Sequence, residues 1–392
     1  ITLTELQDNG GTANGGSDTA TLTVSGSVNL AFNELPTIEA TYSPDATLFY
    51  NAGTLSGYNE RVSAISVSQD GKTLLVTGSE GNNNSGRTYL RVYARDAENG
   101  KLTLLQSFTQ GEQDDPSTPA FEVNGLNTIT TLAQSKDGTS VYVAGYAAGG
   151  STSVYSLVQF SRDATTGQLS YVGIVATQGV DGVSGLDAAV SEIVISDDGT
   201  SLYTINGVTP MDGSTGKNAV AFFSRDTTSG ALTFVGSLIG SDTLPLKSPS
   251  GIVLSSDGKS AYISNQGNNS ITVLSRDAET GNLSYVATIN KSTIAADVNS
   301  AEIPKDDRYL TALQDIAISP DNRFVYVSSN SQGTVSIFSR DSDTGALTYA
   351  GIMDLYNSES HVPTELRATS LREIVISQDG SALYVAAFGG SS

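Results

Sequence analysis

One stretch of thirteen residues recurs along the chain, and this repetition constrains the fold more than any other feature. The stretch reads SRDATTGQLSYVG at residues 161–173. Its other copies are SRDTTSGALTFVG (224–236), SRDAETGNLSYVA (275–287), SRDSDTGALTYAG (339–351) and the looser ARDAENGKLTLLQ (94–106). A chain that repeats itself at a regular interval builds one structural unit several times. The sequence therefore predicts several copies of one small motif.

A second motif alternates with the first and fixes the length of the unit. It is a turn sequence of the type Ser-x-Asp-Gly (Asn in place of Gly in one copy), followed by apolar residues. The copies begin at Ser68, Ser135, Ser196, Ser255, Ser319 and Ser377, at intervals of 58–67 residues. The last copy is followed by only one further apolar run, ALYVAAF. Five complete units and an incomplete sixth are therefore predicted.

Each unit is predicted to contain four strands. In one unit the apolar runs are SEIVIS (191–196), SLYTI (201–205), AVAFFSRD (219–226) and ALTFVGSL (231–238). The first and second pairs are joined by DDGT and TTSG, in which Asp favours the start of a turn and Gly tolerates a positive φ. No window of helical length carries a 3.6-residue apolar stripe. Four antiparallel strands repeated radially form a blade of a β-propeller, an all-β fold whose closure removes most exposed strand edges.

Six blades are expected, with seven as the alternative if one connection hides a further blade. Residues 38–53 (IEATYSPDATLFYNAG) resemble the outer hairpin at 335–351. We expect them to supply strands three and four to the blade that begins at 370–389, so that both chain ends close the ring. If residues 38–53 instead pair with another copy of the chain, the same closure becomes a joint between copies.

The repeated Arg-Asp pair of the SRD sequence has two interpretations. It is either a turn-stabilising pair near the rim, which contributes roughly 0–1 kcal/mol when exposed, or a comb of charges that binds a ligand. The aromatic position of the same hairpin is predicted to pack between neighbouring blades. It is occupied by Tyr171, Phe234, Tyr285 and Tyr349, and by Leu104 in the loose copy.

Composition restricts the partners of the chain. The 41 acidic and 20 basic residues give a formal net charge of −21, which repels nucleic acid and anionic membrane surfaces. No segment approaches the roughly 18 apolar residues of a membrane span. Calcium and cationic surfaces are the expected partners instead. Because the chain contains no Cys, no disulfide staples the fold and no thiol takes part in chemistry.

The units from about residue 60 to 392 resemble the lactonase-like, or YVTN-type, propeller repeats of bacteria. Those repeats typically read SPDG-x-x-VYV followed by FSRD-x-x-TG-x-L, and the connection QGVDGVSGLDAA (178–189) is similar to theirs. The resemblance implies the propeller fold. The family takes its name from sugar-lactone hydrolases, whereas tandem copies in large surface proteins mostly have no shown activity, and this is what the resemblance implies here.

Residues 1–29 resemble something else, namely the last hairpin of cadherin-like or VCBS-type repeats in very large bacterial adhesins. The match lies in the loop DNGGTANGGSDT and the strands beside it. We therefore expect a β-hairpin segment at 1–35 and the propeller at 36–392. The chain begins at Ile1 without Met or signal peptide, so we interpret it as a piece of a longer polypeptide. The expected parent is a secreted or cell-surface protein of a Gram-negative bacterium.

Few residues suggest catalysis. His361, in SESHVPTE, is the single histidine of the sequence, and no GxSxG nucleophile elbow accompanies it. A surface role is expected for it. Metal sites built from His or Cys are excluded by this count, so a metal would need oxygen ligands, which favours Ca²⁺ or Mg²⁺.

One set of carboxylates is predicted to meet at the centre of the ring. The residue four positions before each motif serine is, in order, Ala64, Thr131, Glu192, Gly251, Asp315 and Glu373. The innermost strands line the central channel, so Glu192, Asp315 and Glu373 are our candidate ligands for Ca²⁺ or another divalent cation. The alternative is a solvated ring in which Arg372 pairs with one acid, and Gln314 lies next to Asp315.

Other acidic positions lie in connections and are expected to be solvated turns or weak calcium sites: Asp114, Asp115, Asp181, Asp187, Asp306 and Asp307, with Asp8, Asn9 and Asp18 near the N-terminus. The connections that leave strand four emerge on one face of the disc: 107–124, 177–188, 241–249, 290–311 and 354–369. Loops on one face of a rigid scaffold commonly form a binding surface.

Three functions remain open from the sequence. The first is a non-catalytic binding module of an extracellular protein, with a glycan, a protein or a neighbouring copy on the loop face. The second is a metal-dependent sugar lactone hydrolase that uses Glu192, Asp315 and Glu373. The third is a structural spacer or fibre subunit.

Overall fold

The computed structural model describes residues 61–79, 88–97, 99–111, 123–149, 152–207, 217–297, 309–355 and 370–387. Several sequence predictions lie outside these residues and are not tested by it. They are the N-terminal hairpin at 1–35 with Asp8, Asn9 and Asp18, the pairing of residues 38–53, the loop acids Asp114, Asp115, Asp306 and Asp307, and the environment of His361.

The described residues form six antiparallel sheets, which we number as blades 1 to 6 in chain order. Blade 1 contains β1 (Arg61–Val67), β2 (Thr73–Ser79), β3 (Thr88–Arg95) and β4 (Leu102–Thr109). Blade 2 contains β5 (Asn127–Gln134), β6 (Ser140–Gly149), β7 (Thr152–Arg162) and β8 (Leu169–Thr177). Blade 3 contains β9 (Val190–Ile195), β10 (Ser201–Asn206), β11 (Ala219–Arg225) and β12 (Leu232–Ile239).

Blades 4 and 5 continue the pattern, and blade 6 begins it again. Blade 4 contains β13 (Pro249–Leu254), β14 (Ser260–Asn265), β15 (Ser270–Arg276) and β16 (Leu283–Ile289). Blade 5 contains β17 (Leu313–Ile318), β18 (Phe324–Ser329), β19 (Thr334–Arg340) and β20 (Leu347–Asp354). Blade 6 contains β21 (Leu371–Ile376) and β22 (Leu383–Ala387). The described helices are α1 (Lys291–Asp297) and a 3₁₀ turn, η2 (Gln266–Asn268).

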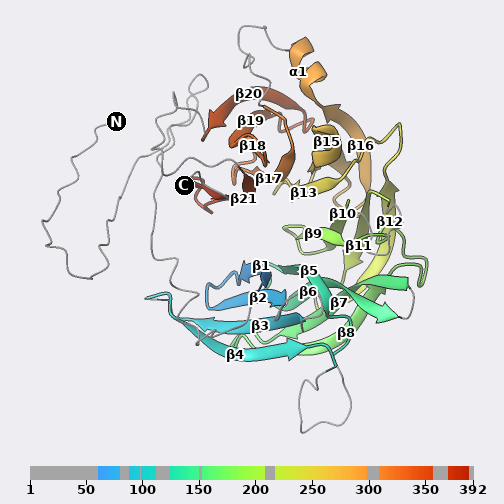
Figure 1. Cartoon of the computed structure of the whole chain (residues 1–392), viewed down its shortest axis with the longest axis vertical. Coiled ribbons are helices and arrows are strands. Elements are labelled where there is room, and N and C mark those ends of the chain that lie inside the picture. Colours follow the sequence, from blue (N-terminus) through green and yellow to red (C-terminus); the bar gives the residue numbers. More distant parts are fainter. Residues whose placement is uncertain are drawn as a thin grey trace, which may run out of the picture.

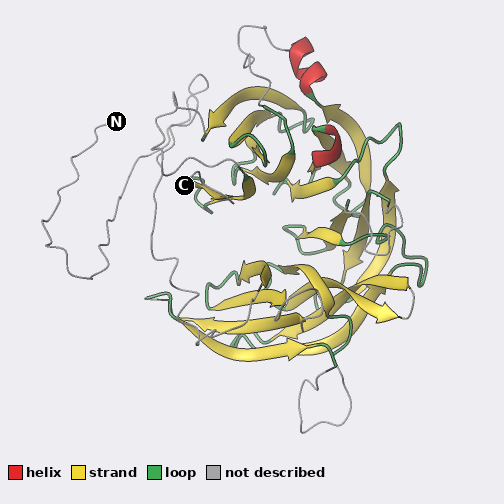
Figure 2. Ribbon diagram, in the orientation of Figure 1, coloured by secondary structure: helices red, strands yellow, loops and turns green. Residues whose placement is uncertain are grey.

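The prediction of an all-β propeller built from four-stranded units is confirmed. In blades 1 to 5 the strands are hydrogen-bonded in their sequence order. The first strands of successive blades are neighbours, in the order β1, β5, β9, β13, β17 and β21. Figure 1 shows these inner strands around a common centre, with β1 and β21 at the two ends of an arc, and Figure 2 shows how little of the described chain is helical.

The strand order separates the repeated turns from the variable loops. Because neighbouring strands are antiparallel, turns one-to-two and three-to-four lie at one end of every blade. Both repeated motifs, Ser-x-Asp-Gly and SRD-x-x-TG, are therefore on one face of the disc, which we call the motif face. The described parts of the connections between blades and of the two-to-three loops lie on the opposite face, the loop face.

The apolar core lies between blades. From blade 2 onward, each inner strand packs two residues against the preceding blade. Val190 and Ile193 of blade 3, for example, are 2% and 5% exposed and join Tyr142 of blade 2 in one cluster. Leu371 and Ile374 of blade 6 are packed in the same way against Tyr326 of blade 5. One blade alone leaves these residues in water, so stacking of blades is what makes the strands stable.

The arginine of the SRD sequence joins each blade to the one before it, and we call this contact the blade clasp. In the clasp between blades 4 and 5, Nη2 of Arg340 lies 2.8 Å from Oδ2 of Asp257, in the Ser-x-Asp-Gly turn of blade 4. Its Nε donates to the hydroxyl of Tyr262 at 2.7 Å, and Nη2 also donates to Oγ of Ser260 at 3.2 Å. Tyr262 in turn donates to the carbonyl of Gly345 at 2.8 Å, in the next turn of blade 5.

The same clasp recurs at three other interfaces. The other arginine–aspartate pairs are Arg162–Asp70 (3.1 Å), Arg225–Asp137 (2.9 Å) and Arg276–Asp198 (3.3 Å). The arginine side chains are 0–2% exposed. The sequence interpretation of an exposed Arg-Asp pair within one turn is therefore wrong. The Asp that follows each Arg caps its own turn instead, as when Asp226 Oδ1 accepts the backbone N–H groups of Thr228 and Ser229 at 3.0 and 2.7 Å.

Blade 1 shows what the clasp tyrosine contributes. The position that holds Tyr142, Tyr203 and Tyr262 in blades 2, 3 and 4 is Leu75 in blade 1. Arg162, which reaches into blade 1, still binds Asp70 and Thr73, but its Nε has no hydrogen-bond partner among the described residues. A buried donor without a partner costs about 1–3 kcal/mol, so this is the weakest of the four clasps.

The aromatic position of the outer hairpin packs between blades in three of its five copies. Tyr171 meets Phe160 edge-on, with 5.5 Å between ring centroids, in the cluster between blades 1 and 2. Phe234 packs on Phe223 in the next cluster, and Tyr349 is buried between blades 4 and 5. The prediction is wrong for Tyr285, which is 42% exposed on β16. Leu104 is 53% exposed on β4, but among the described residues no preceding blade packs on blade 1, so this copy is not tested.

Candidate functional site

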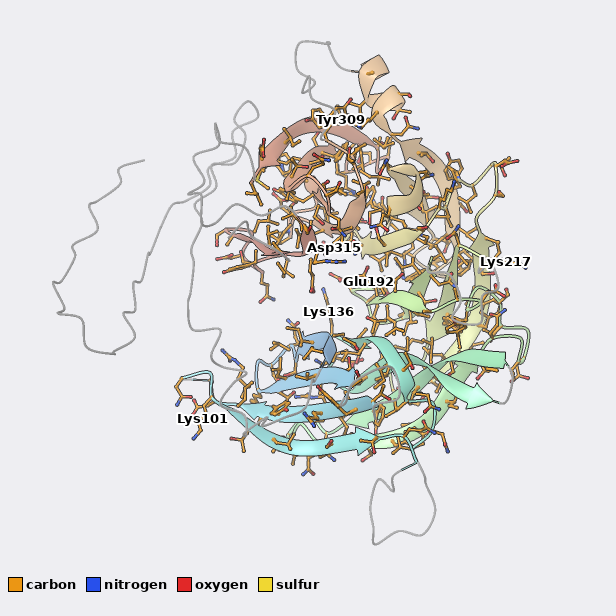
Figure 3. All side chains as sticks on the ribbon, in the orientation of Figure 1. Lys101, Lys136, Glu192, Lys217, Tyr309 and Asp315 are labelled. Atoms are coloured by element: carbon orange, nitrogen blue, oxygen red, sulfur yellow. The ribbon has the colours of Figure 1, made fainter. Side chains whose placement is uncertain are left out.

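The predicted ring positions lie on the inner strands, as the sequence register required. Glu192 is on β9, Asp315 on β17 and Glu373 on β21, each at the same distance from the motif turn. Figure 3 shows Glu192 and Asp315 near the centre around which the blades are arranged. Glu373 is exposed. The ring positions of the other three blades are Ala64, Thr131 and Gly251, which carry no charge.

Glu192 and Asp315 perform the same structural task on different blades. Oε2 of Glu192 accepts the backbone N–H of Ile252, on the inner strand of blade 4, at 2.7 Å. Oδ2 of Asp315 accepts the backbone N–H of Ile374, on the inner strand of blade 6, at 2.8 Å. Each carboxylate therefore links its own inner strand to that of the following blade.

Gly251, at the ring position of blade 4, makes room for Asp315. A Cβ at this glycine would lie 2.9 Å from Oδ1 of Asp315 and 3.0 Å from the backbone nitrogen of Ile316. That nitrogen donates to the same Oδ1 at 2.8 Å. Any side chain at residue 251 must displace the carboxylate, so glycine at this position is part of how the acids are packed.

The environment of the two acids raises the pKa of both. Burial is the largest cause for Glu192, whose pKa lies well above its usual range, and the negative charges of Asp315 and Glu373 add to it. Burial also raises the pKa of Asp315 to about 6, against two backbone N–H groups that lower it, and Glu373 adds repulsion. Groups on three blades are thus coupled through the channel, and clustered acids with raised pKa values are typical of functional sites.

These shifts make stability depend on pH in a defined direction. A carboxyl whose pKa is higher in the folded state adds stability when protonated, and this is lost as the pH rises through the folded pKa. For Asp315 that loss falls between about pH 4 and pH 7. Asp70, Asp137 and Asp198 act in the opposite sense. Burial raises the pKa of Asp137 and Asp198, but hydrogen bonds together outweigh it, and hydrogen bonds led by that from Ser68 lower the pKa of Asp70, so all three pKa values are about 2 and their stabilisation is lost below about pH 4.

We expect Glu192→Gln to melt at a higher temperature than the parent at pH 8 and at the same temperature near pH 4.5. The amide oxygen can still accept the N–H of Ile252, while the charge and its repulsion of Asp315 are removed. Because burial and the neighbouring acids hold the pKa of Glu192 above its usual range, the gain is expected to grow as the pH rises from 4.5 to 8. Calorimetry between pH 4 and 8 measures it. Glu279→Gln, at an exposed turn, is the control, and parallel curves for all three proteins would contradict the expectation.

The candidate metal ligands remain a prediction. Among the residues that the structure describes, no three His, Cys, Asp or Glu side chains are arranged to hold a metal ion. Arg372 and Glu373 are both exposed on β21. Gln314, next to Asp315, is engaged elsewhere. Its Oε1 accepts hydrogen bonds from the side-chain N–H groups of Asn330 and Gln266 at 2.8 and 3.3 Å. Both carboxylate oxygens of Asp315 accept a backbone N–H, whereas Glu192 accepts one through Oε2 alone, so its Oε1 is the oxygen with a free position for a Ca²⁺ ion.

The blade clasp is the arrangement that sequence reasoning missed. A signal for it was present. In each unit that precedes a clasp arginine, the second residue after the motif serine is Asp. In most of these units the seventh residue after the serine is Tyr. Periodicity placed these residues on strands and turns, but it could not reveal that they meet in the neighbouring blade.

On the loop face, the described connections are held in fixed conformations by side-chain hydrogen bonds. In the connection between β8 and β9, Gln178 donates to Asp187 at 2.8 Å and accepts the backbone N–H of Leu186 at 2.8 Å. Asp187 is therefore engaged within its own loop. At the tip of the same loop Val180 is 51% exposed, and Asp181 is exposed beside it. In the next connection the side chain of Asn268 binds the carbonyl of Pro245 at 2.9 Å.

Comparison with known proteins supports the fold and its lactonase-like character. The family model of the lactonase with a 7-bladed β-propeller matches residues 237–295 and 290–389. A putative 6-phosphogluconolactonase from Bacteroides fragilis is 20% identical, covers 83% of this chain and 76% of its own, and has a TM-score of 0.54. The periplasmic gluconolactonase of Pseudomonas aeruginosa is 19% identical, and the match covers 82% of this chain and 77% of that protein, with a TM-score of 0.54.

Other comparisons add no activity. A functionally unknown protein from Desulfotomaculum acetoxidans is 16% identical over 86% of this chain and 81% of its own, with a TM-score of 0.52. A search of curated protein sequences finds no match. At these identities the solved structures show the fold alone. Within the described residues, the helices are too short to cross a membrane.

Proposed function

We propose that this propeller is a non-catalytic binding module of a secreted or cell-surface bacterial protein, with its ligand, a glycan or a protein, on the loop face. One observation carries the proposal: both repeated motifs lie on the motif face, where their charged side chains are used in blade clasps. The described ends of the segments that differ between units lie on the loop face. A scaffold that is constant on one face and variable on the other suits recognition.

The geometry of the loops supports the same proposal. The Gln178–Asp187 and Asn268–Pro245 hydrogen bonds fix the described connections before any ligand arrives. A preformed surface loses less conformational entropy on binding than a flexible one. Val180 and Asp181, exposed at a loop tip, offer an apolar and a charged contact to such a ligand. The net charge of −21 and the adhesin-like residues 1–29 support an extracellular setting.

A glycan array and an array of extracellular-matrix proteins test this function. We expect a bound probe whose signal falls at least tenfold in Val180→Ser/Asp181→Ser. The matched control is Thr165→Ser/Asp163→Asn, which changes an exposed turn on the motif face. Equal loss in both variants, or a signal that neither changes, would show that the loop face is not the binding surface.

A second candidate, a metal-dependent lactone hydrolase, is favoured by a different observation. The matched part of the lactonase family model includes Asp315 and Glu373, and the pKa of Asp315 is raised to about 6, so this carboxyl can exchange a proton near neutral pH. Glu192, Asp315 and Glu373 would hold Ca²⁺, which would polarise a lactone carbonyl.

Titration of acid release from glucono-1,5-lactone separates the two candidates. If the protein is a hydrolase, the rate of lactone hydrolysis should exceed the spontaneous rate in the presence of calcium and fall to the spontaneous rate in chelator. The Glu192→Gln variant should show only the spontaneous rate. The binding module should leave the spontaneous rate unchanged in every condition. Glu279→Gln again serves as the control for an acid outside the channel.

A further inference from the structure

Successive blades meet through a recurring set of contacts. Each blade has a front face, which meets the next blade, and a back face, which meets the preceding one. In blades 2 to 6 the front face presents the turn Asp, the clasp Tyr and, on its inner strand, an apolar residue two positions after the ring position. Blade 1 keeps the turn Asp but has Leu75 and Ser66 at the other two positions. The back face of the next blade presents the clasp Arg and, on its inner strand, the residues two before and one after the ring position. At the interface of blades 3 and 4, Val194 of the front face packs in the cluster that contains Ile252 of the back face.

Blade 1 presents a back face that is not covered within the described residues. Its Val62 and Ile65 are 54% and 51% exposed. The equivalent residues of blade 3, Val190 and Ile193, are 2% and 5% exposed because blade 2 covers them. Arg95 is held as the other clasp arginines are, with Nη1 donating to the carbonyl of Gly71 at 3.2 Å, but it has no Asp partner among the described residues.

Blade 6 presents the matching front face, and it too is uncovered in the described part of the chain. Its Val375 and Tyr384 are 52% and 63% exposed. They occupy the positions of Val194 and the clasp tyrosine Tyr203 in blade 3. Asp379 is oriented as in every other motif turn, with its Oδ1 accepting the hydroxyls of Ser377 and Ser381 at 2.6 and 2.7 Å.

The channel carboxylates follow the same rule. Glu192 and Asp315 each accept the backbone N–H one residue after the ring position of the following blade, namely Ile252 and Ile374. Glu373 is the ring residue of blade 6, so its corresponding donor is the backbone N–H of Ile65 on blade 1. For a charge pair, an apolar contact and a carboxylate–amide contact, one partner thus lies on the front face of blade 6 and the other on the back face of blade 1.

We propose that blade 6 packs directly on blade 1 of the same chain, so that the ring closes with six blades. In the closed ring Arg95 pairs with Asp379 and donates to the hydroxyl of Tyr384, Val375 covers Ile65, and Glu373 accepts the N–H of Ile65. Other front faces are not available to Arg95, since blade 6 itself covers that of blade 5 through Leu371 and Ile374. This inference is independent of the ligand, and it departs from the 7-bladed description of the matching family.

Cross-linking of introduced cysteines tests the closure without interference, because the chain has no Cys. Ile65→Cys/Val375→Cys is treated with a short bismaleimide, and intact mass and peptide mapping identify the bridge. Val194→Cys/Ile252→Cys, at an interface already formed, is the matched control. We expect both proteins to form the intramolecular bridge to the same extent. A bridge in the control alone would overturn the proposal, as expected if a seventh blade separates the two faces.

Two further measurements complete the test. The single variants Ile65→Cys and Val375→Cys are mixed and treated in the same way, and a covalent dimer between them would show that the faces join two copies instead. Charge exchange provides a readout without cysteine: Arg95→Asp and Asp379→Arg should each lower the melting temperature, and the double variant should recover most of the loss. Additive losses in the double variant would overturn the pairing of Arg95 with Asp379.

Discussion

Arg340→Met is expected to lower the free energy of unfolding by about 2–4 kcal/mol. The arginine side chain is 0% exposed and is the donor that joins Asp257, Tyr262 and Ser260 of blade 4 to blade 5. Breaking a fully buried pair typically costs about 3–5 kcal/mol, and the lower range applies because Asp257 keeps 26% exposure and can be rehydrated. Methionine keeps most of the side-chain length, so the loss reports the hydrogen bonds. Chemical denaturation of both proteins measures it.

Lys136→Met is the matched control for that result. Lys136 also pairs with an aspartate across blades, since its Nζ lies 2.5 Å from Oδ1 of Asp197. Both partners are exposed, at 54% and 40%, and such a pair contributes no more than about 1 kcal/mol. Equal losses in the two variants would mean that the blade clasp is no stronger than a surface salt bridge.

Gly281→Ala is expected to cost about 2–4 kcal/mol, for two reasons that add. Gly281 has a φ of +73°, in the left-handed region that L residues disfavour. A Cβ there would also lie 2.5 Å from Oγ of Ser201 in the preceding blade. That hydroxyl accepts Nη2 of Arg276 at 3.0 Å, so it cannot move away without weakening the clasp. The carbonyl of Gly281 is itself the acceptor for Tyr203.

Gly182→Ala separates the two contributions. Gly182 has a φ of +79°, but a Cβ there would meet no atom within 4 Å. Only the backbone term, about 1–2 kcal/mol, is then expected. The difference in unfolding free energy between the two variants measures the steric term. Equal losses would mean that the turn glycine is required for its conformation alone and that the blades do not meet closely at this point.

Rigidity of the blade interfaces bears on the proposed function. Four described interfaces are joined by an arginine that contacts the turn of the preceding blade, and two more contacts link inner strands through Glu192 and Asp315. Because these contacts lie on the motif face and at the centre, they leave the loop face unaffected. Loops can therefore differ from blade to blade while the scaffold beneath them stays the same.

The sequence by itself determined the strands, the turns and the type of fold. These depend on local chemistry: alternation placed SEIVIS and SLYTI on strands, and Asp and Gly defined the turn between them, as β9 and β10 confirm. The ring positions Glu192 and Asp315 were also found from the sequence, because equal distance from a repeated turn places residues at equal height on the inner strands.

Only the tertiary structure decided what those residues contact. Arg340 and Asp257 are 83 residues apart, and Asp315 and Ile374 are 59 apart. Repetition predicts the same residue in every blade, but it does not say which neighbour a side chain reaches. That choice follows from the direction in which the blades stack and from the burial that makes an unpaired arginine costly. The SRD arginine therefore belongs to an interface, although its sequence neighbours suggested a turn.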